Sequence, residues 1–250
     1  MSTHCYSGVR HEGNPEGKFD TIGGVKCYLA TPIVDYSKEK IVLFLPDAFG
    51  IELVNNQLLC DDFAKNGFRV VGVDLFNGDP APLDAMETGT FNLSAWLSKH
   101  GTDVTRPRID NVIATLKHQG IMEFAATGYC FSARYVFDLA FDGIIKVAAV
   151  SHPSLLKIPE DLHKFKQTKV PLLINSCEID QVFSTDSQAQ ADAILGGGLI
   201  KTDLYRREYF DGCTHGFAVR GDMSNPKVKA GKEGAFKAIV EFFLQYFPQS

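Results

Sequence analysis

Short apolar runs alternate with amphipathic stretches along most of the chain. Ile41–Leu45 is wholly apolar and ends at Pro46, which is typical of a buried strand. Asn56–Asn66 is amphipathic and is followed by Gly67, a residue type that often ends a helix. Further strands are predicted at Phe68–Leu75, Ile121–Thr127, Ile145–Val150, Val170–Asn175 and Thr202–Tyr209, and further helices at Phe91–His100, Arg106–Gln119, Ser132–Phe141, Ser187–Leu195 and Val228–Tyr246.

The chain is predicted to begin with an antiparallel hairpin. Lys18–Ile22 and Val25–Thr31 flank two consecutive glycines, which is a hairpin signal. Strands then alternate with helices to the end of the chain. We therefore expect an α/β fold with a mostly parallel central sheet and helices on both faces.

The sequence contains no internal repeat and no linker rich in Gly, Ser or Pro, so a single domain is expected over residues 1–250. Asn77–Thr90 carries Gly, Pro and acidic residues and is predicted to be a loop. With the two helical stretches that follow, it makes residues 77–103 a candidate lid. Gly231 and Gly234 predict weak first turns in the last helix.

Composition narrows the function. The 25 basic residues against 30 acidic residues give a net charge of −5, which disfavours a nucleic-acid partner. No apolar run approaches the roughly 20 residues of a membrane helix, so no membrane partner is expected. The N-terminus lacks the basic stretch and the apolar stretch that are typical of a signal peptide. We therefore expect a cytoplasmic protein whose six cysteines are reduced thiols.

The most informative segment is a strand-to-helix turn after Ile121–Thr127, with the sequence Gly-Tyr-Cys-Phe-Ser-Ala over residues 128–133. A nucleophile on such a sharp turn needs small residues two places before and after it, and its side chain then projects above the sheet. Here Cys130 is the candidate nucleophile, and Ser132 replaces the usual second glycine. A helix N-terminus favours the thiolate form of a cysteine. The alternative is that Cys130 is a small buried residue on a tight turn.

Two backbone amides are candidates for an oxyanion hole. The N–H of Phe131 directly follows the nucleophile. A second donor is expected from the loop after Ile41–Leu45, where the N–H of Ala48 is the candidate.

Hydrolases with such an elbow order their residues as nucleophile, acid and histidine. His215, in a glycine-bracketed loop between the last strand and the last helix, is the candidate general base. His152 follows a strand but precedes any plausible acid, and His163 lies in a lysine-rich stretch typical of the surface. The acid is expected after Val170–Asn175, where Glu178 and Asp180 both qualify and Asp180 is favoured. Its carboxylate would hold the imidazole tautomer and stabilise the imidazolium.

Together these residues resemble the dienelactone hydrolase family, a branch of the α/β-hydrolase fold with a Cys-Asp-His triad. The resemblance covers residues 18–246, and Gly-Tyr-Cys at the elbow is its most specific motif. The other matching motifs are Pro46-Asp47-Ala48-Phe49-Gly50, Val73-Asp74-Leu75-Phe76, Glu178-x-Asp180 and His215-Gly216-Phe217. The run from Asp74 to Pro80 is similar to the fungal or other eukaryotic branch.

The resemblance implies hydrolysis of a small ester or lactone through an acyl-cysteine on Cys130, without a cofactor. Asp47 stands where the family usually carries a glutamate that contacts the resting thiol. Bacterial members bind the substrate carboxylate with two arginines. Arg220 is offset by one position from the first of them. The second would fall near Gly78, where this chain has no arginine. We expect a monomer or homodimer. Phe76, Phe91 and Trp96 are candidates either for an apolar acyl pocket or for packing between lid and core.

Two rival classes remain open at this stage. Cys177 and Cys213 lie in the loops of the predicted acid and base, so they could form a regulatory disulfide or, with Cys130 and His215, a metal site. The close Cys-x-x-Cys pairs of structural zinc sites are missing, so no metal is expected. The second rival is a hydrolase fold that binds without catalysis, because Ser132 and Ala133 could crowd the turn.

Overall fold

The computed structural model describes residues 8–84 and 91–249 and contains an eight-stranded sheet. Its strands are β1 (Lys18–Ile22), β2 (Val25–Ala30), β3 (Lys40–Leu45), β4 (Val70–Val73), β5 (Glu123–Tyr129), β6 (Val147–Ser151), β7 (Leu172–Ile179) and β8 (Tyr205–Thr214), in the spatial order β1-β2-β4-β3-β5-β6-β7-β8. β1 and β2 form the predicted antiparallel hairpin, and β2 pairs antiparallel with β4. All later pairs are parallel.

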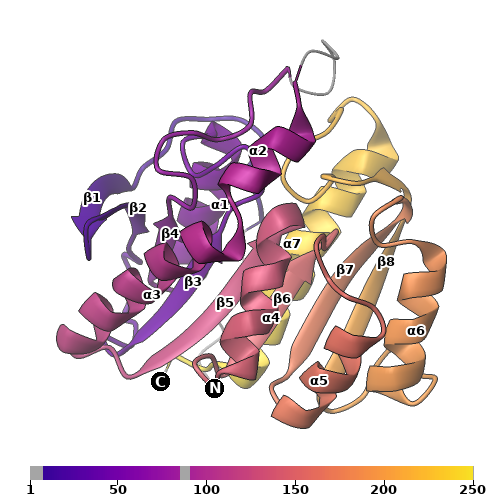
Figure 1. Ribbon diagram of the computed structural model, residues 1–250. Coiled ribbons are helices and arrows are strands. Elements are labelled where there is room, and N and C mark those ends of the chain that lie inside the picture. The colour runs from indigo at the N-terminus through magenta and orange to yellow at the C-terminus, as the bar shows by residue number, and fades with distance from the viewer. Residues whose placement is uncertain (1–7, 85–90, 250) are drawn as a thin grey trace.

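Helices cover both faces of this sheet, as predicted (Figure 1). They are α1 (Val54–Lys65), α2 (Leu93–Lys99), α3 (Thr102–His118), α4 (Ala133–Phe141), α5 (Glu160–Thr168), α6 (Thr185–Gly196) and α7 (Pro226–Tyr246). α1 and α7 lie behind the sheet in Figure 1, and the other helices lie in front of it or at its edges. Among the described residues, no helix is both long enough and apolar enough to cross a membrane.

The wholly apolar run of β3 is explained by its central place in the sheet. Ile41, Leu43 and Leu45 join the core on the side of α3 and α4, whereas Val42 and Phe44 join the core under α1 and α7. Successive side chains of a strand point to opposite faces. A strand covered on both faces therefore needs apolar residues at every position.

Two details differ from the predicted elements. The pattern did not predict α5, whose buried apolar side chains are only Leu162 and Phe165 among exposed lysines. α3 begins at Thr102, four residues before the predicted start, with Asp103 in its first turn. α5 and the first turn of α3 contain few buried apolar residues, which is why hydrophobic periodicity did not define them.

The two glycines of α7 have a packing role. A Cβ on Gly231 would clash with the Cys213 sulfur, and a Cβ on Gly234 would lie 2.7 Å from the ring of Phe210. The helix start is instead stabilised by the side chain of Asn225, which accepts a hydrogen bond from Lys227 N at 3.0 Å. The prediction considered only the low helix propensity of these glycines. The structure shows that they also allow α7 to contact β8 closely.

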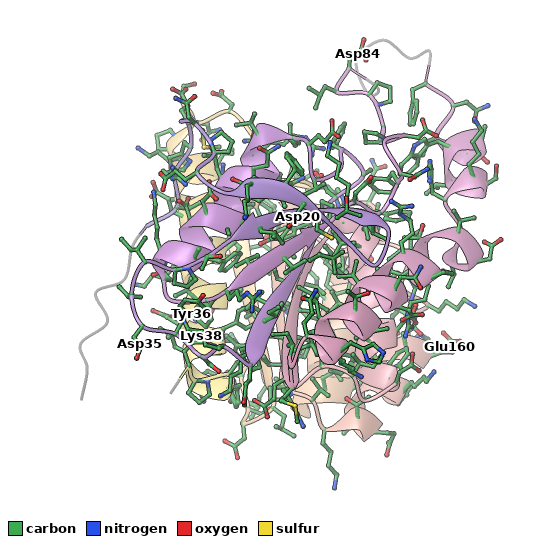
Figure 2. All side chains as sticks on the ribbon, turned by 90° about the vertical axis from the view of Figure 1, so that its left-hand side faces the viewer. Asp20, Asp35, Tyr36, Lys38, Asp84 and Glu160 are labelled. Carbon is green, nitrogen blue, oxygen red and sulfur yellow. The ribbon has the colours of Figure 1, made fainter. Side chains whose placement is uncertain are left out.

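The candidate lid is anchored to the core on both sides of residues 85–90, which lie outside the described residues. Trp96 of α2 is buried and donates a hydrogen bond from Nε1 to Asp79 O at 3.0 Å. Asp84, the last described residue before this segment, lies at the top of Figure 2, far from the labelled Tyr36 on the β2–β3 connection.

Candidate active site

Three predicted site residues follow the carboxyl ends of strands in one part of the sheet. Cys130 directly follows β5, Asp180 directly follows β7, and His215 directly follows β8. These strands belong to one parallel set, with β6 between β5 and β7. Because parallel strands end at the same edge, this is the usual place for a site in an open α/β sheet.

The turn at Cys130 has the strained geometry of an elbow. Cys130 has a φ of +51°, a conformation that a residue with a side chain rarely adopts. A Cβ on Gly128 would lie 2.6 Å from Val136, so glycine is required there. Ser132 is accommodated, because its hydroxyl donates to Leu45 O at 2.6 Å and accepts from Tyr129 N at 2.9 Å. The serine therefore stabilises the turn and gives no sign of crowding it.

Asp180 is held as a carboxylate that orients His215. One of its oxygens lies 2.9 Å from His215 Nδ1, and the other accepts backbone N–H bonds from Val182 and Phe183 at 2.8 and 2.9 Å. Burial alone would raise the pKa of Asp180, but these hydrogen bonds lower it below its ordinary value. The alternative acid, Glu178, is exposed and accepts from Gly212 N instead.

His215 interacts with Asp180 on one side and with Cys130 on the other. Burial would lower the pKa of His215, but its hydrogen bonds and charge attraction with Asp180 and Cys130 outweigh burial and raise this pKa to about 10. Since Nδ1 faces Asp180, Nε2 is the nitrogen available to the sulfur. The arrangement favours a protonated imidazole beside Cys130.

The predicted oxyanion residues lie at the ends of the adjacent strands β3 and β5. Ala48 is in the loop after β3, and its carbonyl accepts from Ala81 N at 2.8 Å. None of the hydrogen bonds between described residues uses the Ala48 N–H. The Phe131 ring packs 5.2 Å from Phe76 and 5.6 Å from Trp96, measured between ring centroids.

Phe76 and Trp96 are thus mainly packing residues between the candidate lid and the elbow. Both are almost completely buried, with exposed fractions of 2% and 6%. Phe91 is partly exposed, and its ring centroid lies 6.2 Å from that of Trp96. An acyl pocket built from all three rings is therefore less well supported than packing of the lid on the core.

Asp47 is buried and forms an ion pair with Arg220. It also accepts hydrogen bonds from Asn56 Nδ2 at 3.2 Å and from Phe49 N at 3.3 Å. Burial raises the pKa of Asp47 above its ordinary value, although the Arg220 charge opposes this. Its hydrogen bonds with described residues do not include Cys130, so the thiol contact that the resemblance implies for this position is replaced by the contact with Arg220.

Two residues that the sequence did not assign to the site lie beside it, in the segment that leaves β6. The Ser154 hydroxyl oxygen is 3.4 Å from the Cys130 sulfur. The ring centroid of His152 is 4.9 Å from that of His215. Their position directly after a parallel strand between β5 and β7 was the available signal. His163, by contrast, is exposed on α5.

The other thiols are poorly suited to chemistry. Cys27, Cys60, Cys177 and Cys213 are free and buried, and Cys5 lies outside the described residues. Burial, followed by the negative charge of Asp180, raises the pKa of Cys177 to about 12. Within the described part of the chain, no group of three or more His, Cys, Asp or Glu side chains is placed to hold a metal ion.

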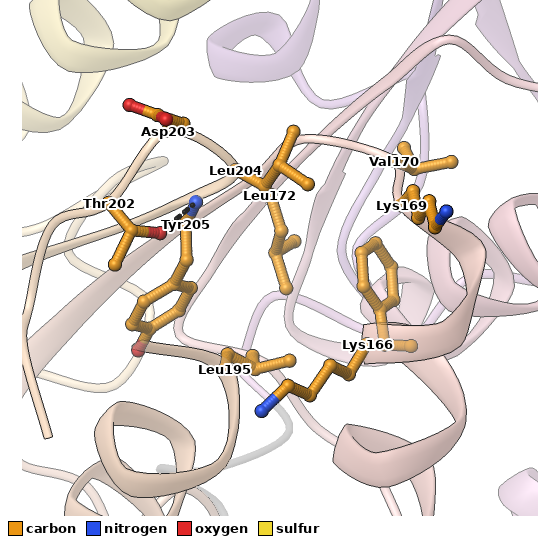
Figure 3. Close-up of a pocket in the computed structure, with 10 residues that line it drawn as sticks. Lys166, Lys169, Val170, Leu172, Leu195, Thr202, Asp203, Leu204 and Tyr205 are labelled. Carbon is orange, nitrogen blue, oxygen red and sulfur yellow. Dashed lines mark hydrogen bonds between the residues drawn. The ribbon is translucent and has the colours of Figure 1, made fainter. Parts of the chain in front are cut away.

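A separate pocket of about 340 Å³ lies at the opposite edge of the sheet (Figure 3). It is lined by residues at the amino ends of β7 and β8, such as Leu172 and Tyr205, and by Lys166 and Lys169. None of the predicted site residues lines it.

Comparison with known proteins gives a consistent result over nearly the whole chain. Residues 25–247 match the dienelactone hydrolase family. The chain is 33% identical to the hydrolase pyvD of Aspergillus violaceofuscus, covering 97% of this chain and 95% of that protein. It is 30% identical to dienlactone hydrolase 1 of Gibberella moniliformis, covering 95% and 91% of the two chains. Both relatives are fungal, which agrees with the branch that the Asp74–Pro80 motif indicated.

The fold is shared with solved structures at much lower sequence identity. A candidate dienelactone hydrolase from Klebsiella pneumoniae superposes with a TM-score of 0.69 at 16% identity, covering 92% of this chain and 98% of that chain. This likeness confirms the predicted hydrolase-type α/β architecture.

Proposed function

The chain belongs to the dienelactone hydrolase family, and from that membership we propose that it hydrolyses a small carboxylic ester or lactone through an acyl-cysteine on Cys130. The observation that carries the proposal is the order of contacts at the sheet edge. A carboxylate with lowered pKa holds His215, and His215 in turn interacts with a half-buried cysteine on a strained elbow. This is the nucleophile, base and orienting acid of an acyl-transfer site.

Acylation would begin with transfer of the Cys130 thiol proton to His215 Nε2. The sulfur then attacks the carbonyl carbon of the substrate and forms a C–S bond. The N–H groups of Phe131 and Ala48 would stabilise the negative oxygen of the tetrahedral intermediate. The C–O bond breaks next, and the leaving alkoxide takes the proton back from His215. In a lactone, this alcohol remains part of the same molecule.

Deacylation would reverse the roles, with water in place of the thiol. His215 takes a proton from the water, whose oxygen attacks the thioester carbon. The C–S bond breaks, and the proton on His215 returns to the sulfur. The balance is one ester or lactone plus one water giving an acid and an alcohol.

Arg220 supports a substrate with a negative charge. Its side chain is partly exposed, with a relative exposure of 37%, while its partner Asp47 is buried. A substrate carboxylate would compete with Asp47 for the guanidinium, which suits planar carboxylate recognition. Binding of such a substrate would then weaken the ion pair between Asp47 and Arg220, and in this way it would change the charge distribution of the candidate site.

The direct test measures hydrolysis of p-nitrophenyl esters and simple lactones by the native protein and by Cys130→Ala. We expect the variant to lose at least about a thousandfold in kcat/KM, because the nucleophile is removed. Cys213→Ala is the matched control, since it removes a buried thiol two residues before His215 and should retain activity. Equal hydrolysis by the native protein and Cys130→Ala would refute the assignment of the nucleophile.

A trapping experiment tests the intermediate separately. Acid quenching during turnover of a slow ester should give an acyl group on the peptide that contains Cys130, seen by mass spectrometry. An acyl group on a different residue would contradict the mechanism even if the protein is an esterase.

A further inference from the structure

A side-chain hydroxyl lies within hydrogen-bonding distance of the Cys130 sulfur. Ser154 Oγ lies 3.4 Å from Cys130 Sγ, and Ser154 is only 8% exposed. The backbone N–H of Ser154 also donates to the carbonyl oxygen of Cys130 at 3.0 Å. Two hydrogen-bonding groups of one residue therefore contact the candidate nucleophile.

The backbone places Ser154 there by an unusual path. The chain leaves β6 at Ser151, and His152 and Leu155 have φ values of +39° and +61°. Neither residue is glycine, so both conformations are unfavourable in isolation. The strain is retained where the segment turns Ser154 back toward the elbow.

A thiolate can only accept hydrogen bonds, and a donor besides the imidazole stabilises it further. Asp47 is not this donor, because its side-chain oxygens interact with Arg220 and Asn56, and its hydrogen bonds with described residues do not include the sulfur. The Ser154 hydroxyl can accept from the neutral thiol and, by rotating its O–H, donate to the thiolate.

We propose that Ser154 is a further catalytic residue, whose hydroxyl donates a hydrogen bond to the Cys130 thiolate. This proposal rests on the proposed function, in which Cys130 is the nucleophile. No bond to Ser154 forms or breaks, because the thiol proton goes to His215 and Ser154 keeps its own. The hydrogen bond is strongest when the sulfur is charged, before attack and again as the C–S bond breaks in deacylation.

The test compares alkylation of Cys130 by iodoacetamide across pH in the native protein and in Ser154→Ala. The modified peptide is followed by mass spectrometry, so the other thiols do not interfere. We expect alkylation about tenfold slower on the acidic limb, and a pH midpoint about one unit higher, because a hydrogen bond to the charged form is lost. The other ionisable groups of this corner, which are His215, Asp180, His152 and the Asp47–Arg220 pair, remain unchanged.

Two variants separate this role from a structural one. Ser151→Ala removes a buried hydroxyl from the same segment, but that hydroxyl bonds to Asn175 at 3.1 Å and not to the sulfur, so the midpoint should stay at the native value. Ser154→Thr retains the hydroxyl and should retain the midpoint. The Ser154 backbone bond to Cys130 survives in both Ser154 variants.

The outcomes are distinct. A shifted midpoint in Ser154→Ala alone supports the proposal, whereas a native midpoint, or an equal shift in Ser151→Ala, overturns it. If Ser154→Ala does not fold, Ser154→Gly makes the same comparison. Because alkylation needs no substrate, these results are independent of hydrolysis by Cys130→Ala, which tests the proposed function itself.

Discussion

Two histidines meet at the carboxyl edge of the sheet, with their ring centroids 4.9 Å apart, and their surroundings differ sharply. His215 has Asp180 at 2.9 Å from Nδ1 and Cys130 beyond its other nitrogen. His152 is completely buried, and neither of its ring nitrogens has a hydrogen-bond partner among the described residues. Both follow parallel strands, so position alone does not separate them.

The difference in partners favours the protonated form of His215 and the neutral form of His152. Hydrogen bonds and charge attraction raise the pKa of His215 despite its burial. Burial, and then the positive charges of His215 and Arg220, lower the pKa of His152 well below its ordinary value. In the proposed mechanism the base must accept and return a proton, so the carboxylate of Asp180, and not proximity to the nucleophile alone, favours His215 over His152 for this role.

The largest expected effect comes from removing that carboxylate. Asp180→Asn keeps the size of the side chain but removes its charge and places an amide near His215 Nδ1. The imidazole then loses its preferred tautomer and the stabilisation of its charged form, and we expect kcat/KM to fall by about a thousandfold or more. Steady-state kinetics with a neutral p-nitrophenyl ester measures the loss.

Glu178→Gln is the matched control for Asp180→Asn. It makes the same chemical change two residues away, where the side chain is exposed and bonded to Gly212 N. We expect it to retain activity. Comparable losses in both variants would mean that Asp180 does not distinguish the two histidines.

The next largest expected effect is on the stability of the fold in acid, and it depends on His152. The unfolded chain protonates this histidine near pH 6.5, whereas the folded protein keeps it neutral, so stability is lost as pH falls below that value. The slope is about 1.4 kcal/mol per pH unit for one group. His152→Asn tolerates the positive φ but does not titrate, and it should lose about 2 kcal/mol less than the native protein between pH 6.5 and pH 5.

Urea unfolding at several pH values measures this difference. His163→Asn on α5 is the control, because His163 is exposed and its replacement should leave the native acid slope unchanged. His215 acts in the opposite range: its raised pKa contributes stability that is complete below about pH 6.5 and is lost as pH rises toward about 10. An unchanged acid slope in His152→Asn would show that His152 is not held neutral.

Much of the fold was predictable because each strand carries its own signal. The alternation of apolar runs with helices gave the sheet, and the rule that sites follow parallel strands directed attention to the turns that hold Cys130, Asp180 and His215. The choice of Asp180 over Glu178 agrees with the observed hydrogen bond to His215, although its catalytic role remains a proposal.

What the sequence did not reveal depends on backbone conformation. Positive φ values at His152 and Leu155, neither of which is glycine, turn Ser154 toward the elbow, and no periodicity encodes such a path. His152 was set aside as a base because it precedes the acid along the chain, a reason that says nothing about its place in space. The pairing of Asp47 with Arg220 joins residues 173 positions apart, which spacing along the chain does not predict.

The smallest expected effect separates binding from proton transfer at this edge. The charge of Arg220 helps keep His152 neutral, and the same guanidinium is paired with Asp47 and lies 3.8 Å from the centroid of the Phe49 ring. In Arg220→Gln, a substrate carboxylate loses its charged partner, so we expect KM for an anionic ester to rise about tenfold, while kcat and the KM of a matched neutral ester change little. Asp180→Asn should instead lower kcat for both esters. If Arg220→Gln lowered kcat for the neutral ester as strongly as Asp180→Asn does, then Arg220 would belong with His215 in proton transfer, and the contrast between the two histidines would not rest on Asp180 alone.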